Sequence, residues 1–410
     1  MKKLAVLLIV ALLFSVTGCN KIQSENMMID KKPREVSGIT ELSEKNVVLT
    51  DFGVRLFQES FHTEKNILIS PISLVYALGM TANGATGETL EEMEAVIGMP
   101  VDELNEYLYS YQKKLSQGDK YELSLANSIW FTDDERVSIE EDFLQINADY
   151  YGSDVYRTPF DDQTVKDINN WVKQNTNEVI PKILDEIPKE AVMYLVNALA
   201  FEAEWQKVYY DSQVREDVFT LEDGTKQNVE FMFSEEYNYL EDENTIGFLK
   251  YYADCKYAFV ALLPNEGISI RDYVADLSGE KVNHFIENRK EGVVFAAIPK
   301  FKTEFNVNVK EILLNMGLKS GFDAERADFS RLGTSTDGNI YISRVLQNAF
   351  ISVGEKGTEA GAATLVEMND EGAAEPKEIK RVYLDRPFIY MLIDCETNIP
   401  FFIGTMMQVE

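Results

Sequence analysis

The side chains that most often perform enzymatic chemistry are scarce in this chain of 410 residues. It has two histidines, His62 and His284, and neither has the HExxH spacing of a zinc protease or a cysteine partner. A Ser–His–Asp triad would need one of them, and the GxSxG turn that often carries the serine does not occur. The stretch 354–361, GEKGTEAG, matches neither a GxGxxG nor a Walker A loop. We therefore expect no metal, no cofactor and no catalytic site, and a protein that acts by binding or by changing shape.

Charge and composition narrow the classes of partner. The chain has 39 Lys and Arg against 69 Asp and Glu, a formal charge of −30. Nucleic-acid binding needs a basic patch, so no nucleic-acid partner is expected. The acidic run 88–96, ETLEEMEAV, is interpreted as the solvated face of a helix rather than a pair of catalytic carboxylates. Apolar residues make up 45% of the chain, which is enough for a large core.

Small side chains are concentrated in residues 358–367, and their order suits a β-strand. If alternate residues share a face, one face is small and uncharged throughout: Thr358, Ala360, Ala362, Thr364 and Val366. Such a segment could enter a close-packed sheet in which larger side chains would clash. Gly354 and Gly357 would permit unusual backbone angles where the chain must hinge. The alternative interpretation is an ordinary Ala/Gly surface loop.

The first 19 residues are predicted to be a targeting segment. Two lysines precede an apolar stretch, residues 4–16, of about the length of a signal-peptide core and too short to span a bilayer well. The sequence 16–19, VTGC, is similar to a bacterial lipobox, in which the cysteine becomes the lipidated N-terminus. We expect an exported protein that is anchored at the bacterial cell surface through Cys19, or shed from it. The alternative is plain secretion with Cys19 free.

The rest of the chain is predicted to form a polar tether, residues 20–43, and one continuous domain, residues 44–410. No Pro/Gly-rich linker divides the domain. Helices are predicted at 70–84 and 164–177 from their caps and apolar spacing. Strands are predicted, mostly later in the chain, at 121–131, 256–264, 292–301, 347–355 and, as a pair, within 386–407. Because helices come first and strands later, without βαβ alternation, the fold class is α+β.

Two cysteines remain beyond the targeting segment. Cys255 and Cys395 both lie in apolar, strand-like runs. Two cysteines are too few for a disulfide framework. We expect buried free thiols, and a bridge between the two is the alternative.

Several long motifs resemble those of the serpins, the serine-protease-inhibitor superfamily. The segment 353–368, VGEKGTEAGAATLVEM, is similar to the serpin hinge and proximal reactive loop. Further motifs occur in serpin order over nearly all of residues 44–410, at 66–93, 168–184, 195–209, 298–330 and 386–407.

The resemblance implies one domain of about nine helices and three β-sheets with an exposed reactive loop at about residues 355–381. A target protease cleaves the loop and becomes esterified to it. The loop then inserts as a central strand of the large sheet and distorts the protease before hydrolysis finishes. Such a protein is a protease inhibitor rather than an enzyme. In the native state we expect residues 358–370 to be held out of the sheet.

The resemblance also assigns residues to the hinge and to the region where the sheet opens. The hinge has the small side chains of inhibitory serpins and comprises Glu355, Gly357, Thr358, Glu359, Ala360, Gly361, Ala362 and Ala363. Lys300 and Glu355 match an ion pair at the top of the sheet, and Trp205 matches an aromatic residue beside it. A polar cluster beneath the strands that must part is matched by Ser70, Ser73, Asn197 and Gln347. Gln347 stands where the family usually has histidine. The alternative is that these residues only stabilise the sheet.

Two ways of counting residues along the chain give different positions for the peptide bond that the protease would cleave. Counting from the hinge gives the bond between Glu371 and Gly372, whereas counting back from Pro387 gives a position near Pro376. We prefer the hinge count because the inserted strand needs a fixed length. Alternative cleavage positions are Val366, Met368, Ala373, Ala374 and Lys377.

The predicted target is an extracellular serine protease, elastase-like or of broad specificity, because the acidic loop EMNDE would repel a protease that selects basic residues. Papain-like cysteine proteases remain an alternative. The inhibitor is expected to be a monomer that forms a covalent complex with its target. A non-inhibitory serpin that serves as a cell-surface binding protein is the second hypothesis, and a surface hydrolase is the third.

Overall fold

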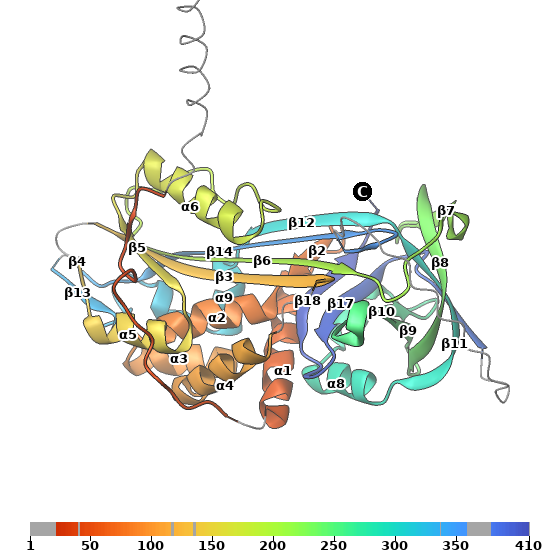
Figure 1. Ribbon diagram of the computed structural model, residues 1–410, viewed down its shortest axis with the longest axis horizontal. Helices are drawn as coiled ribbons and strands as arrows, with labels where there is room; N and C mark the ends of the chain where they lie inside the picture. Colours follow the sequence, from red (N-terminus) through yellow and green to blue (C-terminus); the bar gives the residue numbers. More distant parts are fainter. Residues whose placement is uncertain are drawn as a thin grey trace, which may run out of the picture.

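Two large β-sheets and a two-stranded sheet form the framework of the protein, and helices pack against them (Figure 1). The computed structural model describes residues 22–39, 42–115, 119–133, 137–336, 338–358 and 379–409. Within these ranges the architecture is α+β, with three sheets, as predicted.

The seven-stranded sheet contains the long strands of the middle of the chain. Its order is β1–β5–β3–β6–β15–β14–β12. The strands are β1 (Glu25–Asn26), β5 (Asp154–Thr158), β3 (Tyr121–Thr132), β6 (Met193–Glu204), β15 (Gly357–Thr358), β14 (Ile342–Val353) and β12 (Phe301–Asn308).

The nine-stranded sheet occupies the right-hand half of Figure 1. Its order is β16–β11–β8–β9–β10–β17–β18–β2, and β7 pairs with β8. The strands are β16 (Ile379–Tyr383), β11 (Lys290–Pro299), β8 (Lys226–Glu241), β9 (Thr245–Tyr251), β10 (Tyr257–Pro264), β17 (Phe388–Asp394), β18 (Pro400–Met406), β2 (Ile67–Ile69) and β7 (Val214–Thr220). A separate two-stranded sheet joins β4 (Val137–Ile139) to β13 (Gly333–Ser335).

The described residues form nine α-helices, most of them in the first half of the chain. They are α1 (Ser43–Ser60), α2 (Pro71–Ala82), α3 (Gly87–Ile97), α4 (Val101–Lys114), α5 (Glu141–Tyr150), α6 (Asp162–Asn175), α7 (Ile270–Ala275), α8 (Gly279–Glu287) and α9 (Lys310–Met316).

The seven-stranded sheet is covered on both faces. Helix α6 lies across one face (Figure 1), where Trp171 and Val172 share an apolar cluster with Trp130 of β3. The opposite face packs on the main core, in which every residue of α2 is buried. A substitution on either face of this sheet therefore affects a close-packed layer.

The local sequence signals for the two predicted helices are confirmed. Helix α2 begins after Ser70, whose hydroxyl accepts a hydrogen bond from the Ser73 N–H, and Pro71 occupies its first turn. Helix α6 begins two residues earlier than predicted because Asp161 caps it. The predicted strand 292–301 is divided in the structure, since β11 ends at Pro299 and β12 starts at Phe301.

The segment that was predicted to be a tether instead lies against the body of the protein. Residues Glu25 and Asn26 pair with β5 and add an edge strand to the seven-stranded sheet. The backbone N–H and hydroxyl of Ser24 both donate to Asp167, and the Arg34 side chain donates to the buried Asp149. Sequence composition indicated only a polar stretch, whereas these bonds join residues more than 100 positions apart.

The prediction of two buried thiols is wrong for Cys255. It lies in a short turn with a positive φ of 55° and is exposed, whereas Cys395 is half-buried. Both are free thiols. Burial raises the pKa of the Cys395 thiol to about 12, which keeps it protonated and unreactive at neutral pH.

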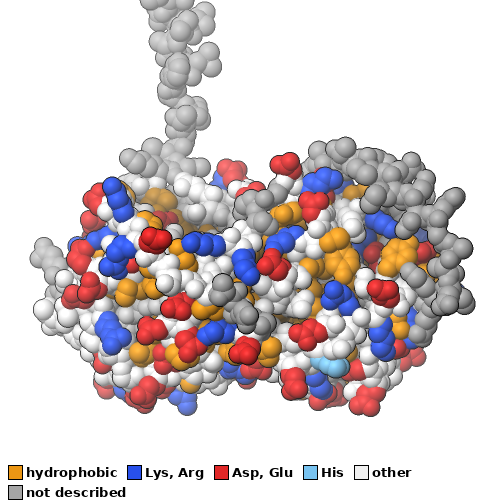
Figure 2. All heavy atoms as spheres, turned by 60° about the horizontal axis from the view of Figure 1, so that its bottom comes forward, with side chains coloured by type: hydrophobic (Ala, Val, Ile, Leu, Met, Phe, Trp, Pro, Cys, Tyr) orange, Lys and Arg blue, Asp and Glu red, His pale blue; other side chains and the backbone are white. Residues whose placement is uncertain are grey.

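Acidic and basic side chains are interspersed on the face seen in Figure 2, as expected for a solvated surface. No helix in the described ranges is both long and apolar enough to cross a bilayer.

We predict that the contact between the N-terminal segment and α5 stabilises the fold measurably. Burial alone would raise the pKa of Asp149, but hydrogen bonds from Arg34 and Gln145 outweigh it, and the pKa is lowered. The stabilisation is therefore present at neutral pH and is lost as the pH falls through the folded pKa, below about 3.9. Asp149→Asn should lower the free energy of unfolding by about 1–3 kcal/mol at pH 7, measured by thermal melting.

Asp185→Asn is the matched control, because Asp185 forms an ion pair with Lys182 in which both side chains are exposed. It should change stability by less than about 0.5 kcal/mol. Equal effects of the two substitutions would contradict the prediction.

Candidate functional site

The two central strands of the seven-stranded sheet part at one end. Strands β6 and β14 are parallel and pair directly from Met193 to Leu199 and from Ile342 to Ala349. Beyond these residues β15 lies between them, antiparallel to both. The sheet therefore has a gap that an antiparallel strand arriving from residue 358 could continue to fill.

Thr358 already occupies the start of this gap. It lies opposite Ala203 on one side and Val353 on the other, and it is fully buried. Its hydroxyl is 2.7 Å from the Tyr252 hydroxyl. Burial raises the pKa of Tyr252, so this phenol stays protonated. Thr358 was predicted to be held out of the sheet with the loop; instead the partner hydroxyl of Tyr252 makes its burial favourable.

Only glycine fits at position 357. Its φ is +152°, and a Cβ placed there would be 1.9 Å from the carbonyl oxygen of Ala203. Gly357 therefore adopts one of the unusual backbone angles that glycine was expected to permit at the hinge. Gly354 does not adopt such an angle in this structure, since its φ is not positive, and an added Cβ there would meet nothing within 4 Å.

Hydrogen bonds to three backbone carbonyls hold the turn before Gly357 in place. The Trp205 N–H donates to the Lys356 carbonyl at 2.8 Å, and its indole N–H donates to the Gly354 carbonyl at 2.8 Å. The Tyr209 N–H donates to the Glu355 carbonyl at 2.9 Å. Trp205 also stacks on Tyr252, with ring centroids 4.3 Å apart. One aromatic pair thus fixes both the turn and the Thr358 contact.

The predicted ion pair is present beside this turn. Lys300 Nζ is 2.7 Å from Glu355 and 3.0 Å from Glu230. The hydrogen bond from Lys300 lowers the pKa of Glu355, and the same contact raises the pKa of Lys300. Because these side chains are about one-third exposed or more, solvent and salt weaken the pair. It orients the loop base more than it stabilises the fold.

The predicted polar cluster joins α2 to the two strands where they still pair. Gln347 donates to the Ser70 carbonyl at 2.9 Å and to Asn197 Oδ1 at 3.0 Å, and it accepts from the Ser70 N–H at 3.2 Å. Ser73 donates to Asn197 Oδ1 at 3.1 Å. All four side chains are buried. Separating β6 from β14 at this level would break the hydrogen bond between Gln347 and Asn197. The cluster therefore opposes separation of the two strands, and it does so through uncharged side chains.

A buried ion pair beneath Trp205 was missed at the sequence level. Lys250 Nζ is 2.9 Å from Glu236, and it lies 5.3 Å and 4.3 Å from the ring centroids of Trp205 and Tyr209. Burial would lower the pKa of Lys250, but the neighbouring Tyr209 and Glu236 outweigh it and raise the pKa. The sequence signal that could have indicated this ion pair is the presence of Lys250 within the largely apolar stretch 247–252, GFLKYY.

The remaining predicted site residues lie outside the described ranges. They are the lipidation residue Cys19, the hinge residues Glu359, Ala360, Gly361, Ala362 and Ala363, and the cleavage candidates Val366, Met368, Glu371, Gly372, Ala373, Ala374, Pro376 and Lys377.

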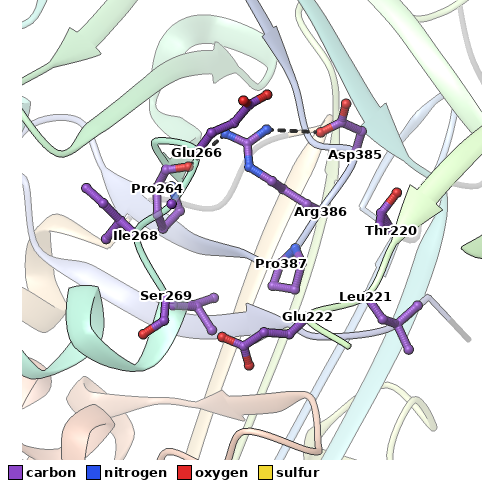
Figure 3. A pocket seen from close by; sticks show the side chains of 12 residues that line it. Thr220, Leu221, Glu222, Pro264, Glu266, Ile268, Ser269, Asp385, Arg386 and Pro387 are labelled. Atoms are coloured by element: carbon purple, nitrogen blue, oxygen red, sulfur yellow. Dashed lines mark hydrogen bonds and ion pairs between the residues drawn. The ribbon is translucent and has the colours of Figure 1, made fainter. Parts of the chain in front are cut away.

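The described residues include no group of three His, Cys, Asp or Glu that could hold a metal ion. One pocket of about 460 Å³ is formed by the β10–α7 loop, the β7–β8 turn and residues 385–387 (Figure 3). In this pocket the Arg386 guanidinium donates hydrogen bonds to the Asp385 carboxylate at 3.2 Å and to the Pro264 carbonyl at 2.7 Å. These contacts position loops rather than a reacting group.

Comparison with known proteins identifies the family. Residues 48–409 match the model of the family Serpin (serine protease inhibitor). The chain is 30% identical, over 90% of its length and 87% of the relative, to an uncharacterized serpin-like protein of Thermococcus kodakarensis. It is 27% identical to the leukocyte elastase inhibitor of Xenopus laevis, over 83% of this chain and 92% of that one. The chain belongs to the serpin family.

Two solved structures of one thermophilic serpin, Tengpin, are similar to this protein. The native-state structure has a TM-score of 0.90 at 47% identity and covers 95% of this chain and 100% of its own. The latent-state structure has a TM-score of 0.80 at 44% identity and covers 92% of this chain and 100% of its own. The arrangement described above is therefore more similar to the native-state structure.

We predict that Gln347→His makes stability depend on pH where the natural residue does not. A histidine in this buried cluster is desolvated, which lowers its folded pKa below the usual value of about 6.5. Its neutral form is favoured in the fold, so stability is lost as the pH falls below about 6.5. The measurement is the difference in melting temperature between variant and natural protein at pH 8 and pH 5.5. A difference that stays constant across this range would contradict the account of the cluster.

Proposed function

We propose that this protein is a suicide-substrate inhibitor of extracellular serine proteases that traps its target by inserting the cleaved loop into the seven-stranded sheet. The observation that carries the proposal is Thr358, which lies between two strands that do not yet pair with each other at that level. The gap continues in the direction in which the next residues would extend.

The side chains that follow Thr358 fit the face that they would occupy. Thr358 points toward Tyr252 and the main core. In a continuing strand, alternate residues would face the same way, and these are the small residues Ala360, Ala362, Thr364 and Val366. Glu359 and Glu367 would face the opposite side. A bulky or charged residue on the inner face would have to enter a close-packed layer.

Insertion would also change the pairing of the sheet. The direct parallel pairing of β6 and β14 spans only Met193–Leu199 and Ile342–Ala349. A full new strand would replace it by antiparallel ladders along both strands. More backbone hydrogen bonds would form than break, which supplies a driving force for the movement.

The class of target is proposed from the loop sequence. An acidic loop and the cleavage candidates from Val366 to Lys377 favour an elastase-like or broad-specificity serine protease, with papain-like cysteine proteases as an alternative. The bond between Glu371 and Gly372 remains the first choice. The similarity to a leukocyte elastase inhibitor supports this class without naming the target. Mass spectrometry of the peptide released by each protease would identify the bond.

Location at the cell surface through a lipid on Cys19 is likewise a proposal from the sequence.

The second candidate function, that of a non-inhibitory binding protein, has weaker support. Human thyroxine-binding globulin shares the fold at 24% identity and a TM-score of 0.79, and this likeness concerns the fold alone. The small side chains after Thr358 favour an inhibitor.

We predict that Thr358→Arg converts the inhibitor into a substrate. The arginine cannot enter the buried position beside Tyr252, because its charge would lose hydration without a partner. The natural protein should form a complex with its target protease that survives denaturing gel electrophoresis. The variant should be cleaved with at least about tenfold less complex.

Thr358→Ser is the matched control, because it keeps the hydroxyl that contacts Tyr252 and should still form the complex. Undiminished trapping by the arginine variant would overturn the proposed mechanism. Absence of a stable complex between the natural protein and any serine or cysteine protease would favour the binding-protein hypothesis.

A further inference from the structure

A short stretch of chain just beyond the end of β6, residues 205–209, holds the hinge. Because β6 ends one residue before it, the ladder of the seven-stranded sheet does not fix this stretch. The Trp205 and Tyr209 N–H groups nevertheless donate to the carbonyls of Lys356 and Glu355, at 2.8 and 2.9 Å. Contacts outside that sheet must therefore keep these two donors in place.

One ammonium group contacts this stretch at three points. Lys250 Nζ donates to the Lys207 carbonyl at 3.3 Å. It also lies 5.3 Å and 4.3 Å from the ring centroids of Trp205 and Tyr209. A cation is attracted to the face of an aromatic ring, so each of these contacts favours one orientation of the ring. The ammonium therefore holds the middle of the stretch and both of the residues that bind the hinge.

Glu236 of β8 places the ammonium. Its carboxylate is 2.9 Å from Lys250 Nζ, and it also accepts a hydrogen bond from the Ser234 hydroxyl at 2.7 Å. The Ser234 hydroxyl is in turn 3.3 Å from the Tyr209 hydroxyl. One carboxylate thus directs both the cation and the far end of the Tyr209 ring.

Stability alone does not account for a charged pair at this place. Lys250 and Glu236 are 2% and 8% exposed, so both charges have lost most of their hydration. Apolar side chains of similar volume often give equal or greater stability than a buried ion pair. They would fill the space beneath Trp205 without fixing the direction of a ring or of a carbonyl. Orientation of the stretch above it explains the pair better than stability does.

We propose that Lys250 and Glu236 form a positioning pair that determines how efficiently the cleaved loop is inserted. The pair acts through Trp205 and Tyr209, which hold the carbonyls of residues 354–356 and so define the point from which the loop enters the gap. This inference rests on the proposed function and adds to it two residues that control its outcome.

Trapping depends on a competition between insertion of the loop and hydrolysis of the ester that joins the loop to the protease. In hydrolysis, water cleaves the ester and leaves a carboxylate on the loop and a free hydroxyl on the protease. If the hinge is positioned less well, insertion begins more slowly while hydrolysis continues at its own rate. The ratio of cleaved inhibitor to covalent complex measures this competition, whatever the rate of the first cleavage.

The test uses the double variant Lys250→Met, Glu236→Gln. Methionine fills the volume of the lysine, and glutamine keeps an oxygen that can accept from Ser234, so no buried charge is left unpaired. A panel of pancreatic elastase, subtilisin, a glutamate-specific endoprotease and papain first identifies a protease that the natural protein traps. For that protease the ratio of cleaved inhibitor to covalent complex should be about fivefold higher in the variant, as expected if the insertion step loses the equivalent of one hydrogen bond.

Hydrogen exchange measured by mass spectrometry follows the positioning in the absence of any protease. Peptides that contain the Trp205 and Tyr209 amides should exchange faster in the double variant, because their hydrogen bonds to the hinge open more often. Peptides from α6 and β18 should exchange as in the natural protein. The melting temperature should stay within about 3 °C of the natural value, a shift that a positioning role does not require.

Lys281→Met, Asp276→Asn is the matched control, because it removes an ion pair in which both side chains are exposed. It should change neither the ratio nor the exchange of residues 205–209. If the double variant fails to fold, Glu236→Gln alone provides the same comparison, since it removes the carboxylate that holds the ammonium and keeps the size of the side chain.

An unchanged ratio in a folded variant, or unchanged exchange at residues 205–209, would overturn the inference while leaving the proposed function in place. So would faster exchange spread evenly over the protein together with a lower melting temperature, since the pair would then serve stability alone. If the natural protein forms no covalent complex with any of the four proteases, the proposed function fails and the inference fails with it.

Discussion

The gap between β6 and β14 is the feature on which the rest of this structure depends. Two parallel strands in the centre of a sheet pair over part of their length and then separate, and of the residues that the structure describes Gly357 and Thr358 lie between them. Backbone groups along this gap would gain partners if more chain entered it. The native fold is therefore one arrangement of a sheet that could hold another strand.

Two groups of side chains keep the sheet in this arrangement. At the open end, Trp205 and Tyr252 hold the hinge by stacking and by hydrogen bonds to its backbone and to Thr358. Where the strands still pair, Gln347 joins Asn197 to the start of α2. The first group fixes the position of Gly357 and Thr358 between the separated strands, and the second holds the two strands together where they pair directly.

Local sequence signals predicted much of the fold but less of the site. Helix α2 is specified by Ser70 and Pro71, and small residues at alternate positions indicated a segment able to become a strand. Lys300 and Glu355 could be paired only through family resemblance, because 55 residues separate them. The burial of Thr358 depends on the point at which β6 and β14 separate. That point is set by contacts between distant parts of the chain, so no short stretch of sequence predicts it. The exposure of Cys255 depends on a turn of positive φ inside an apolar run.

The most direct test of the central claim compares the thermal stability of the intact protein with that of a sample cleaved once within residues 359–378. If the native sheet has room for another strand, cleavage releases the segment after Thr358 to enter it, and the cleaved protein melts at a higher temperature than the intact one. A cleaved protein that melts at the same or a lower temperature would contradict the account.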